Sequence, residues 1–440
     1  MILVKKPYES ALEIIGTEKM EQDCRYRFSA YTVLLDADDA TLLYNGMTGE
    51  MIRLARDEEQ DEYLIARRFM VRSDYDEHAL VAKLKKHYFS AQSDDCRLNF
   101  CTILTTTCCN ARCFYCYERN LKKQTMDARQ ALGIAKYLAD NADKNGIVLD
   151  WYGGEPLLNN QVIDVICNEL KRRNINYSSM MISNGYLFDS EILRRAKNLW
   201  KLTRVQITLD GLNDVYSDIK KYTNGDHNAF DRVMFNICSL MENGIHAEIR
   251  INIDLYNLDN AVRLTEYLIN RFCNQKYINV YLHPLFQNHS SGKIIHTQEE
   301  WLLIAKKAAE LENRLYRHGL FECGLRQAPK THACLADNPK ACTIMPDGNI
   351  IRCRDYPDAA PAGNAIDNTV FGETVRNWRE LSEELEQCGK CVMYPECSRL
   401  KMCDEHKECN SADVLFKENN LKLSMLETFR EFKKKQGMEK

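Results

Sequence analysis

Several familiar signals are missing from this chain of 440 residues. The formal net charge is only −4, so no broad basic surface favours a nucleic-acid partner. No apolar run approaches the ~20 residues that a membrane-spanning helix needs, and the N-terminus lacks the charged and then apolar layout of a signal peptide. We therefore expect a cytoplasmic protein whose partners include neither nucleic acid nor membrane.

Cysteine, by contrast, is abundant, with 19 residues in the chain. In a reducing cytoplasm so many cysteines favour metal ligands or catalytic groups over disulfides. Eight lie between Cys334 and Cys409, three lie between Cys109 and Cys116, and the remaining eight are scattered. We expect most of the scattered cysteines to be small core residues.

The segment from Thr107 to Tyr117 reads T-C-C-N-A-R-C-F-Y-C-Y. It places Cys109, Cys113 and Cys116 in the spacing C-x3-C-x2-C, and Cys108 breaks that spacing. Cysteine thiolates are the usual ligands of iron–sulfur clusters. Three thiolates on one short loop can hold three irons of a cubane and leave the fourth iron open for a small molecule. Because a chain with 19 cysteines could contain this spacing by chance, the motif must be judged together with the residues that follow it.

From Leu98 onward the sequence alternates between strand and helix patterns in six steps. Such alternation is typical of a parallel barrel or sheet, which places its chemistry at the C-terminal ends of the strands. The expected strands are 98–105, 147–152, 177–183, 204–210, 247–254 and 277–283. The expected helices between them are 126–141, 162–173, 191–199, 230–243 and 258–273.

Polar motifs end several of these strands. They are Gly153-Gly154-Glu155-Pro156, Ser183-Asn184-Gly185, Thr208-Leu209-Asp210-Gly211 and Arg250-Ile251-Asn252. Taken singly, each could be an ordinary glycine turn, a turn asparagine or a capping residue. In this order after the C-x3-C-x2-C loop, they resemble the signature of the radical S-adenosylmethionine (SAM) enzymes over roughly residues 98 to 285.

This resemblance implies an α/β fold with a partial (βα)6 TIM-like barrel. It also implies a [4Fe–4S] cluster held by Cys109, Cys113 and Cys116, whose open iron binds SAM, with Tyr115 near the adenine. Other residues expected to contact SAM are Gly153, Gly154, Glu155, Asn184, Thr208, Asp210 and Arg250. In this family the cleaved SAM yields a 5′-deoxyadenosyl radical, which removes hydrogen from an unactivated carbon. No residue can be assigned as a general base from the sequence.

The cysteines after residue 330 form two groups. In the first, Gly348-x4-Cys353 closes a run that begins at Cys334, and in the second, C-x2-C-x5-C starts at Cys388. The pattern resembles the SPASM extension, which holds two auxiliary [4Fe–4S] clusters, and this would bring the number of clusters to three. The family order implies one set of Cys334, Cys342, Cys353 and Cys403 and another of Cys388, Cys391, Cys397 and Cys409.

Two departures weaken the division of these ligands between clusters. Five residues separate Cys397 from Cys403 where the family usually has three, and the last cysteine usually lies further on. Two zinc sites are the alternative, since C-x2-C with later cysteine pairs also suits tetrahedral zinc.

Residues 1–95 carry no cluster motif. Strand patterns at 26–35 and 41–44, with a hairpin signal at Asn45-Gly46, precede helix patterns at 48–54, 64–69 and 77–88. This small α+β module resembles the leader-binding element at the front of many maturases of ribosomally made peptides, which bind a peptide as an added strand. A purely structural extension is the alternative. We therefore expect domains at 1–95, 96–300 and 301–440.

Together these resemblances imply a radical SAM maturase that joins a cysteine sulfur to a carbon of a precursor peptide, as in sactipeptides and ranthipeptides. Its partners would be a precursor with a leader and a cysteine-bearing core, and an electron donor such as flavodoxin or ferredoxin. The alternatives are a carbon–carbon peptide cyclase, an anaerobic sulfatase maturase that forms formylglycine, and a non-catalytic peptide-binding protein stabilised by metals. The long N-terminal module weakens the sulfatase alternative.

Overall fold

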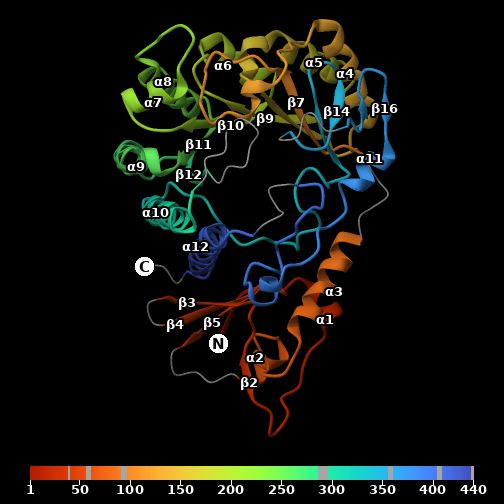
Figure 1. The fold of residues 1–440 in the computed structure, drawn as a ribbon, viewed down its shortest axis with the longest axis vertical. Coiled ribbons are helices and arrows are strands. Elements are labelled where there is room, and N and C mark those ends of the chain that lie inside the picture. Colours follow the sequence, from red (N-terminus) through yellow and green to blue (C-terminus); the bar gives the residue numbers. More distant parts are fainter. Residues whose placement is uncertain are drawn as a thin grey trace. The chain divides into compact units, whose positions relative to one another are not determined.

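The computed structural model of the chain describes residues 1–37, 40–55, 61–90, 97–285, 296–354, 360–403 and 409–437. The chain divides into two compact units (Figure 1). The barrel unit spans residues 94–322 and 334–380, and the terminal unit spans residues 1–93, 323–333 and 381–440. The expected boundary at residue 95 lies outside the described residues. The assignment of separate roles to 1–95, 96–300 and 301–440 stays a prediction.

The barrel unit is built on one large sheet, which in the described residues has the strand order β12-β11-β10-β9-β8-β7-β13-β14-β15-β16. Strands β7 to β12 pair in parallel, each with the next. This confirms the predicted α/β fold with a partial barrel of parallel strands. The six strands are Phe100–Thr106 (β7), Ile147–Gly153 (β8), Tyr177–Ser183 (β9), Leu202–Leu209 (β10), His246–Ile253 (β11) and Ile278–Pro284 (β12).

Helices connect these strands and cover one face of the sheet (Figure 1). They are Ala128–Asn141 (α4), Asn160–Arg172 (α5), Ser190–Asn198 (α6), Asn213–Lys220 (α7), Ala229–Glu242 (α8) and Leu258–Phe272 (α9). Short 3-10 turns lie at Tyr117–Asn120 (η1), Pro156–Asn159 (η2) and Leu255–Asn257 (η3). The capping box of Asp127 and Gln130 starts α4 where the sequence places an acceptor before an apolar helical pattern. Helix α7 was not predicted from the sequence.

The strands of the barrel alternate between an apolar and a polar face. In β10, Val205, Ile207 and Leu209 are buried under the helices, whereas Gln206 and Thr208 on the other face are half-buried. Because successive side chains of a strand point to opposite faces, this alternation separates the core from the barrel interior. The interior face can therefore hold polar groups next to the strand ends.

The C-terminal part of the barrel unit extends the same sheet beyond β7. Strand β13 (Ala341–Ile344) pairs in parallel with β7, and β14 (Asn349–Ile351) returns antiparallel to it. The sheet ends with β15 (Gly363–Asn364) and β16 (Thr369–Val370), and helix α11 is Gly372–Asn377. Helix α10 (Gln298–Arg317) packs against β12, where Glu312 Oε1 accepts the Leu282 N–H at 3.1 Å.

The terminal unit contains a four-stranded antiparallel sheet in the order β1-β5-β4-β3 and a two-stranded ribbon of β2 and β6. The strands are Ile2–Lys5 (β1), Tyr26–Phe28 (β2), Thr32–Ala37 (β3), Ala40–Asn45 (β4), Glu50–Ala55 (β5) and Met70–Arg72 (β6). The helices are Glu9–Ile15 (α1), Asp61–Ala66 (α2), Glu77–Ser90 (α3) and Ser411–Lys435 (α12), with a 3-10 turn at Glu386–Lys390 (η4).

The prediction of a helix at 48–54 is wrong. Residues Glu50–Ala55 form β5, which pairs with β4 through the hairpin at Asn45-Gly46 and with β1 on its other side. Pairing on both edges buries Met51 and Ile52 completely. These long-range contacts decide the conformation, because they outweigh the local preference of a short segment for helix.

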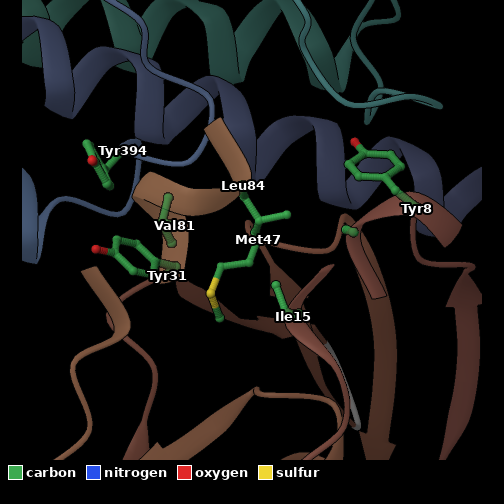
Figure 2. Close-up of a cluster of buried hydrophobic side chains, with 8 residues drawn as sticks. Tyr8, Ile15, Tyr31, Met47, Val81, Leu84 and Tyr394 are labelled. Atoms are coloured by element: carbon green, nitrogen blue, oxygen red, sulfur yellow. The ribbon is translucent and has the colours of Figure 1, made fainter. Parts of the chain in front are cut away.

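A core cluster joins the two ends of the chain within the terminal unit. Figure 2 shows Tyr8, Ile15, Tyr31, Met47, Val81, Leu84 and Tyr394 packed together. Tyr394 comes from the cysteine-rich segment, stacks on His78 with ring centroids 4.8 Å apart, and lies 3.8 Å below the Lys85 ammonium. The cysteine-rich segment therefore packs against the N-terminal module.

Among the described residues, no helix combines the length and apolarity needed to cross a bilayer.

Replacement of Tyr394 by alanine tests this packing. We expect Tyr394→Ala to lower the free energy of unfolding by about 3–5 kcal/mol, as for other large aromatic side chains removed from a core. Urea unfolding followed by circular dichroism measures the change. Phe235→Ala is the control, since Phe235 is 70% exposed, and it should leave the urea midpoint nearly unchanged. Equal midpoints for the two variants would show that Tyr394 does not hold the two segments together.

Candidate functional site

The cysteine loop begins at the C-terminal end of β7 and lies against the end of β8. A Cβ atom at Gly153 would lie 2.1 Å from Thr106 O, and one at Gly154 would lie 2.2 Å from Cys108 O. The Glu155 N–H donates to Cys108 O at 2.9 Å, and the Gly154 N–H donates to Thr106 O at 3.0 Å. Glycine is required at both positions because the backbones of the two segments touch.

The thiols of Cys109, Cys113 and Cys116 are half-buried on this loop. Burial, with the nearby charge of Glu155, raises the pKa of Cys109 to about 12. Burial and then Glu118 raise the pKa of Cys116 to about 12. The Ala111 N–H donates to Cys109 Sγ at 3.3 Å. The raised pKa values mean that these thiols need a positive partner in order to ionise, and a cationic metal centre is such a partner.

Asn184 and Glu155 connect the end of β9 to the cysteine loop. Asn184 donates from Nδ2 to Asn110 Oδ1 at 2.7 Å, and its backbone N–H donates to Glu155 Oε2 at 2.9 Å. Glu155 is fully buried and also accepts from Ser183 Oγ at 2.9 Å. Burial raises the pKa of Glu155 to about 7, although the N–H groups of Asn184 and Leu157 oppose that shift. Glu155 therefore acts as a structural clamp between two strand ends and the loop.

A buried ion pair holds the other side of the loop. Lys220 Nζ lies 2.8 Å from Asp210 Oδ2, and the two side chains are only 3% and 0% exposed. Tyr115 OH donates to Asp210 Oδ2 at 2.8 Å, and Asn252 Nδ2 donates to Asp210 Oδ1 at 3.0 Å. Burial alone would lower the pKa of Lys220, but the charges of Asp210 and Cys113 raise it. A fixed positive charge therefore lies beside the predicted cluster ligand Cys113.

Lys220 also positions the loop through its backbone. Its carbonyl accepts the Arg112 N–H at 2.7 Å, and the Thr223 N–H donates to Asn110 O at 2.9 Å. Sequence reasoning missed Lys220 and helix α7. Lys220 follows the Thr208–Gly211 motif by nine residues without a motif of its own, so no local signal could have found it.

The remaining predicted SAM contacts lie on the interior face of the barrel. Thr208 and Arg250 occupy paired positions on β10 and β11, and both are half-buried. Arg250 donates from Nε to Asn252 Oδ1 at 2.8 Å, which ties it to the Asp210 network. Asp210 accepts from three donors, which tie it to the cysteine loop, and its contact with SAM stays a prediction. Thr208 and Arg250 keep the role of predicted SAM contacts.

Asp150 lies further along this interior face, on β8. It is only 3% exposed, and its Oδ2 accepts from Thr102 Oγ1 at 3.2 Å. Among the described residues, its Oδ1 has no hydrogen-bond partner. Burial raises the pKa of Asp150 to about 6, and the charge of Arg354 opposes that shift.

The structure brings together one of the two predicted auxiliary sets. Burial raises the pKa of Cys391, and the nearby thiols of Cys409, Cys397 and Cys388 raise it further. These four cysteines all belong to the terminal unit. Among the described residues, however, no three His, Cys, Asp or Glu side chains are arranged around a single metal ion. Cluster binding by these four cysteines stays a prediction.

The cysteines of the other set have different surroundings. Cys334 is exposed and accepts the Ala336 N–H at 3.2 Å, as Cys109 does from Ala111. Cys353 is half-buried at the end of the β14 segment, and Cys403 is half-buried in the terminal unit. Cys342 is buried on β13, with its Sγ 3.5 Å from Cys101 Sγ.

The cysteine loop itself fits an iron–sulfur cluster that binds SAM. Three thiols lie on one short loop, two glycines allow the loop to approach the end of β8, and a buried lysine supplies positive charge. When bound, the cluster and SAM would supply a carbon radical. Asn184, Glu155 and Lys220 hold the loop in place.

The buried ion pair of Lys220 and Asp210 predicts how substitutions change the free energy of unfolding. Lys220→Met leaves Asp210 buried without its cation, so we expect a loss of about 3–5 kcal/mol in the free energy of unfolding. Adding Asp210→Asn removes the stranded charge and should recover part of that loss. Lys197→Met, at an exposed position, is the control. Urea unfolding of the reduced apoprotein measures all four proteins, and a wild-type midpoint for Lys220→Met would contradict the expectation.

The raised pKa of Asp150 predicts a dependence of stability on pH. A carboxyl group whose pKa rises on folding, here from an ordinary value of 3.8 to about 6, stabilises the fold at low pH. That contribution is lost as pH rises through about 6. The free energy of unfolding of the wild type should therefore fall by about 3 kcal/mol relative to that of Asp150→Asn between pH 4 and pH 8, because asparagine cannot ionise. Urea unfolding across this range, with exposed Asp367→Asn as the flat control, tests the sign.

Comparison with known proteins shows what this part of the chain resembles. Residues 103–266 match the model described as the radical SAM superfamily. The uncharacterized protein MJ0907 of Methanocaldococcus jannaschii is 28% identical over 267 residues, which are 60% of this chain and 87% of that protein. A GTP 3′,8-cyclase of Clostridium perfringens is 28% identical over 176 residues, which are 38% of this chain. The chain spans only 50% of that cyclase.

Solved structures share the fold. The enzyme anSMEcpe with bound AdoMet superposes with a TM-score of 0.56 at 14% identity, covering 77% of this chain and 94% of that chain. SuiB of Streptococcus suis bound to S-adenosylmethionine superposes with a TM-score of 0.52 at 13% identity, covering 86% of this chain and 94% of that chain. The matched residues begin within β7 and run through the cysteine loop and its supporting strand ends. Residues 103–266, which carry the cysteine loop and its supporting strand ends, therefore resemble the radical SAM superfamily.

Proposed function

We propose that the chain is a peptide maturase that joins a cysteine sulfur to a carbon of a ribosomally made precursor peptide. The observation that carries this proposal is a groove beside an open sheet edge in the terminal unit. The groove has a volume of about 660 Å³, and its lining includes Ala30, Thr32, Val33 and Leu34.

Strand β3 could bind a peptide through the backbone groups of its open edge. It lies at the edge of the four-stranded sheet, and its only strand partner among the described residues is β4. An open edge offers backbone N–H and C=O groups to an added strand, and alternate side chains of that strand then contact pockets. Leu34 is 43% exposed at this edge and can contact an apolar side chain of the peptide.

Other lining residues of the groove belong to the cysteine-rich segment and helix α12. Cys391 and Cys409 line it, together with Lys390, Glu418 and Lys422. A peptide strand along β3 would therefore lie next to two cysteines of a predicted auxiliary set. Charged side chains of both signs at the rim would bind a peptide of mixed charge. Leader binding at 1–95 and the cluster assignments remain part of this proposal.

Relatives of the same fold support a peptide substrate. One structure of anSMEcpe holds AdoMet and a Cp18Cys peptide, and it superposes with a TM-score of 0.54 at 14% identity. One structure of SuiB holds the precursor peptide SuiA and superposes with a TM-score of 0.51 at 14% identity. A peptide that carries cysteine is therefore the first substrate to test.

In the proposed reaction the chain's own residues bind and orient the reactants. Thr208 and Arg250 face the barrel interior and would contact SAM, while Gly153 and Gly154 let the cysteine loop lie close to the end of β8. When bound, the cluster and SAM supply the radical that removes hydrogen from a peptide carbon. Formation of a carbon–sulfur bond releases the thiol proton and one electron, and the predicted auxiliary cysteines would hold clusters able to take up that electron. An electron donor such as flavodoxin or ferredoxin would start each cycle.

The test uses the reconstituted protein with a cysteine-bearing precursor, SAM and a reductant, in the absence of oxygen. We expect 5′-deoxyadenosine, a peptide lighter by two hydrogens per crosslink, and one free thiol fewer per crosslink. The same mass change with every thiol retained would replace thioether formation by carbon–carbon crosslinking. Loss of sulfur from the peptide would indicate formylglycine. Absence of deoxyadenosine with Cys113→Ala, in protein that remains folded, is the control for cluster chemistry.

Variants of the groove test the binding edge in the full chain. Leu34→Lys places a charge where the added strand would pack, so we expect the Kd for a leader-bearing peptide to rise at least about tenfold, since 1.4 kcal/mol corresponds to that factor. Leu132→Lys is the matched control, because Leu132 is 50% exposed on helix α4 of the barrel unit. Fluorescence anisotropy of a labelled peptide measures both, and equal affinities would exclude β3 as the binding edge.

A further inference from the structure

Asp150 of β8 is a buried carboxylate whose hydrogen bonds the fold leaves half satisfied. It is only 3% exposed, and its Oδ2 accepts from Thr102 Oγ1 at 3.2 Å. Among the described residues, no hydrogen-bond donor reaches its Oδ1. Nearly all buried polar atoms of native proteins have a hydrogen-bond partner, so an exception of this kind needs a reason.

The pairing of the strands shows which face of the sheet Asp150 occupies. One row of register partners crosses β7, β8, β9 and β10, and its members are Thr102, Asp150, Met180 and Arg204. Side chains at paired positions of neighbouring strands point to the same face, and that face recurs at every second residue of a strand. Thr208, four residues after Arg204, therefore shares it. Asp150 thus points into the barrel interior, on the face that carries the predicted SAM contacts.

Asp150 lies deeper in the barrel than those contacts. It precedes Gly153, at the end of β8, by three residues. Because a parallel strand rises about 3.3 Å per residue, Asp150 lies about 10 Å along β8 from that end. Thr208 and Arg250 face the same interior closer to the strand ends. A substrate group that reaches past SAM into the barrel would therefore meet Asp150.

The ionised form of Asp150 does not stabilise the fold. Burial raises its pKa to about 6, and the charge of Arg354 opposes that shift, so the carboxyl group is mostly ionised at neutral pH. In that state it makes the fold less stable than a neutral side chain of the same shape would. Side chains that lower stability are typical of functional positions, where activity and stability compete.

Two arginines determine which kind of donor fits beside Asp150. The charges of Arg354 and Arg204 both lower its pKa, against the larger effect of burial. The Arg354 guanidinium lies 4.6 Å from the centroid of the Tyr152 ring. Arg204 forms an ion pair with Glu248 at 3.3 Å. A third cation would be repelled by the two arginines, whereas a neutral donor would not, and its hydrogen bond to a charged acceptor is a strong one.

We propose that Asp150 is a specificity residue of the barrel, and that its Oδ1 accepts a hydrogen bond from a neutral N–H or O–H group of the substrate. The bond transfers neither a proton nor an electron. It fixes the part of the substrate inside the barrel, and so limits which carbon a radical formed at the strand ends can reach. That the substrate is a peptide rests on the proposed function, and a backbone amide would then be the donor.

The first test follows the carboxyl group itself and needs no peptide. Infrared spectra of the reconstituted full chain, minus those of Asp150→Asn, isolate the carboxyl band of Asp150 across its titration. N-Methylacetamide supplies one neutral N–H group, and N,N-dimethylacetamide is the matched probe without it. Because a hydrogen bond to the ionised form favours that form, we expect only N-methylacetamide to lower the pKa of Asp150.

The outcome of the infrared test is decisive in both directions. Thr102, Arg204 and Arg354, which act on Asp150, do not titrate in this range, so the band reports Asp150 alone. Equal shifts with the two amides, or no shift with either, would overturn the proposal. A larger shift with methylammonium than with N-methylacetamide would contradict a neutral donor, since that probe is a cation.

The second test uses turnover of the cysteine-bearing precursor. Asp150→Leu removes both acceptor oxygens, so we expect the KM for the precursor to rise at least about tenfold, as for the loss of a hydrogen bond to a charged group. Asp150→Asn keeps an amide oxygen that can accept, and it should recover part of the affinity. A purely structural role predicts no such order. Asp367→Leu, at an exposed position, is the control and should keep the wild-type KM.

Circular dichroism checks that each variant folds, and Asp150→Ala takes the place of Asp150→Leu if leucine prevents folding. A wild-type KM in the folded variant would show that the substrate does not contact Asp150. If the wild type leaves the precursor unmodified, the proposed function fails, and the infrared test alone then decides this inference.

Discussion

The contact between two backbones, at the ends of β7 and β8, is the constraint on which the site depends. Gly153 and Gly154 lie so close to Thr106 and Cys108 that no side chain fits between them. The cysteine loop therefore takes its position from the edge of the sheet. Contacts from β9 and from the end of α7 then hold its far side through Asn184 and Lys220. A loop held by three elements is restrained before a cofactor binds, and this favours preorganised binding.

Charge inside the barrel unit is arranged in pairs and networks. Lys220 and Asp210 neutralise one another in the core, and Tyr115 and Asn252 complete the hydrogen bonds of the carboxylate. Because a buried ion pair seldom adds much net stability, its value here lies in the position that it gives to the loop. The positive end of that pair lies beside Cys113, where an anionic cluster would benefit from it.

Within the terminal unit, the cysteine-rich segment packs against the N-terminal module, although the two lie far apart in the sequence. Tyr394 fills the core of that module, and Tyr44 donates to Glu396 at 3.2 Å across the same junction. The open edge of β3 and the four cysteines of one predicted auxiliary set thus belong to one compact unit. In the proposed maturase, that body would hold the substrate strand next to its predicted auxiliary ligands.

The sequence by itself determined the features that depend on local spacing. The alternation of strands and helices predicted the parallel strands of the barrel, and the family motifs predicted that Asn184, Glu155 and Asp210 lie at strand ends. Spacing was enough because the carboxyl ends of neighbouring parallel strands meet at one edge of a sheet. The same reasoning recognised the C-x3-C-x2-C loop as the centre of the site.

Only the tertiary structure decided features that depend on contacts between distant residues. It turned Glu50–Ala55 into a strand, brought Lys220 to Asp210, and packed Tyr394 against Tyr31 and His78. It also placed Cys342 beside Cys101 on a neighbouring strand, a contact that the family resemblance, which grouped Cys342 with the predicted cluster ligands, did not indicate. The physical reason is that spacing reports which residues are near along the chain, whereas strand register decides which face of a sheet a side chain occupies.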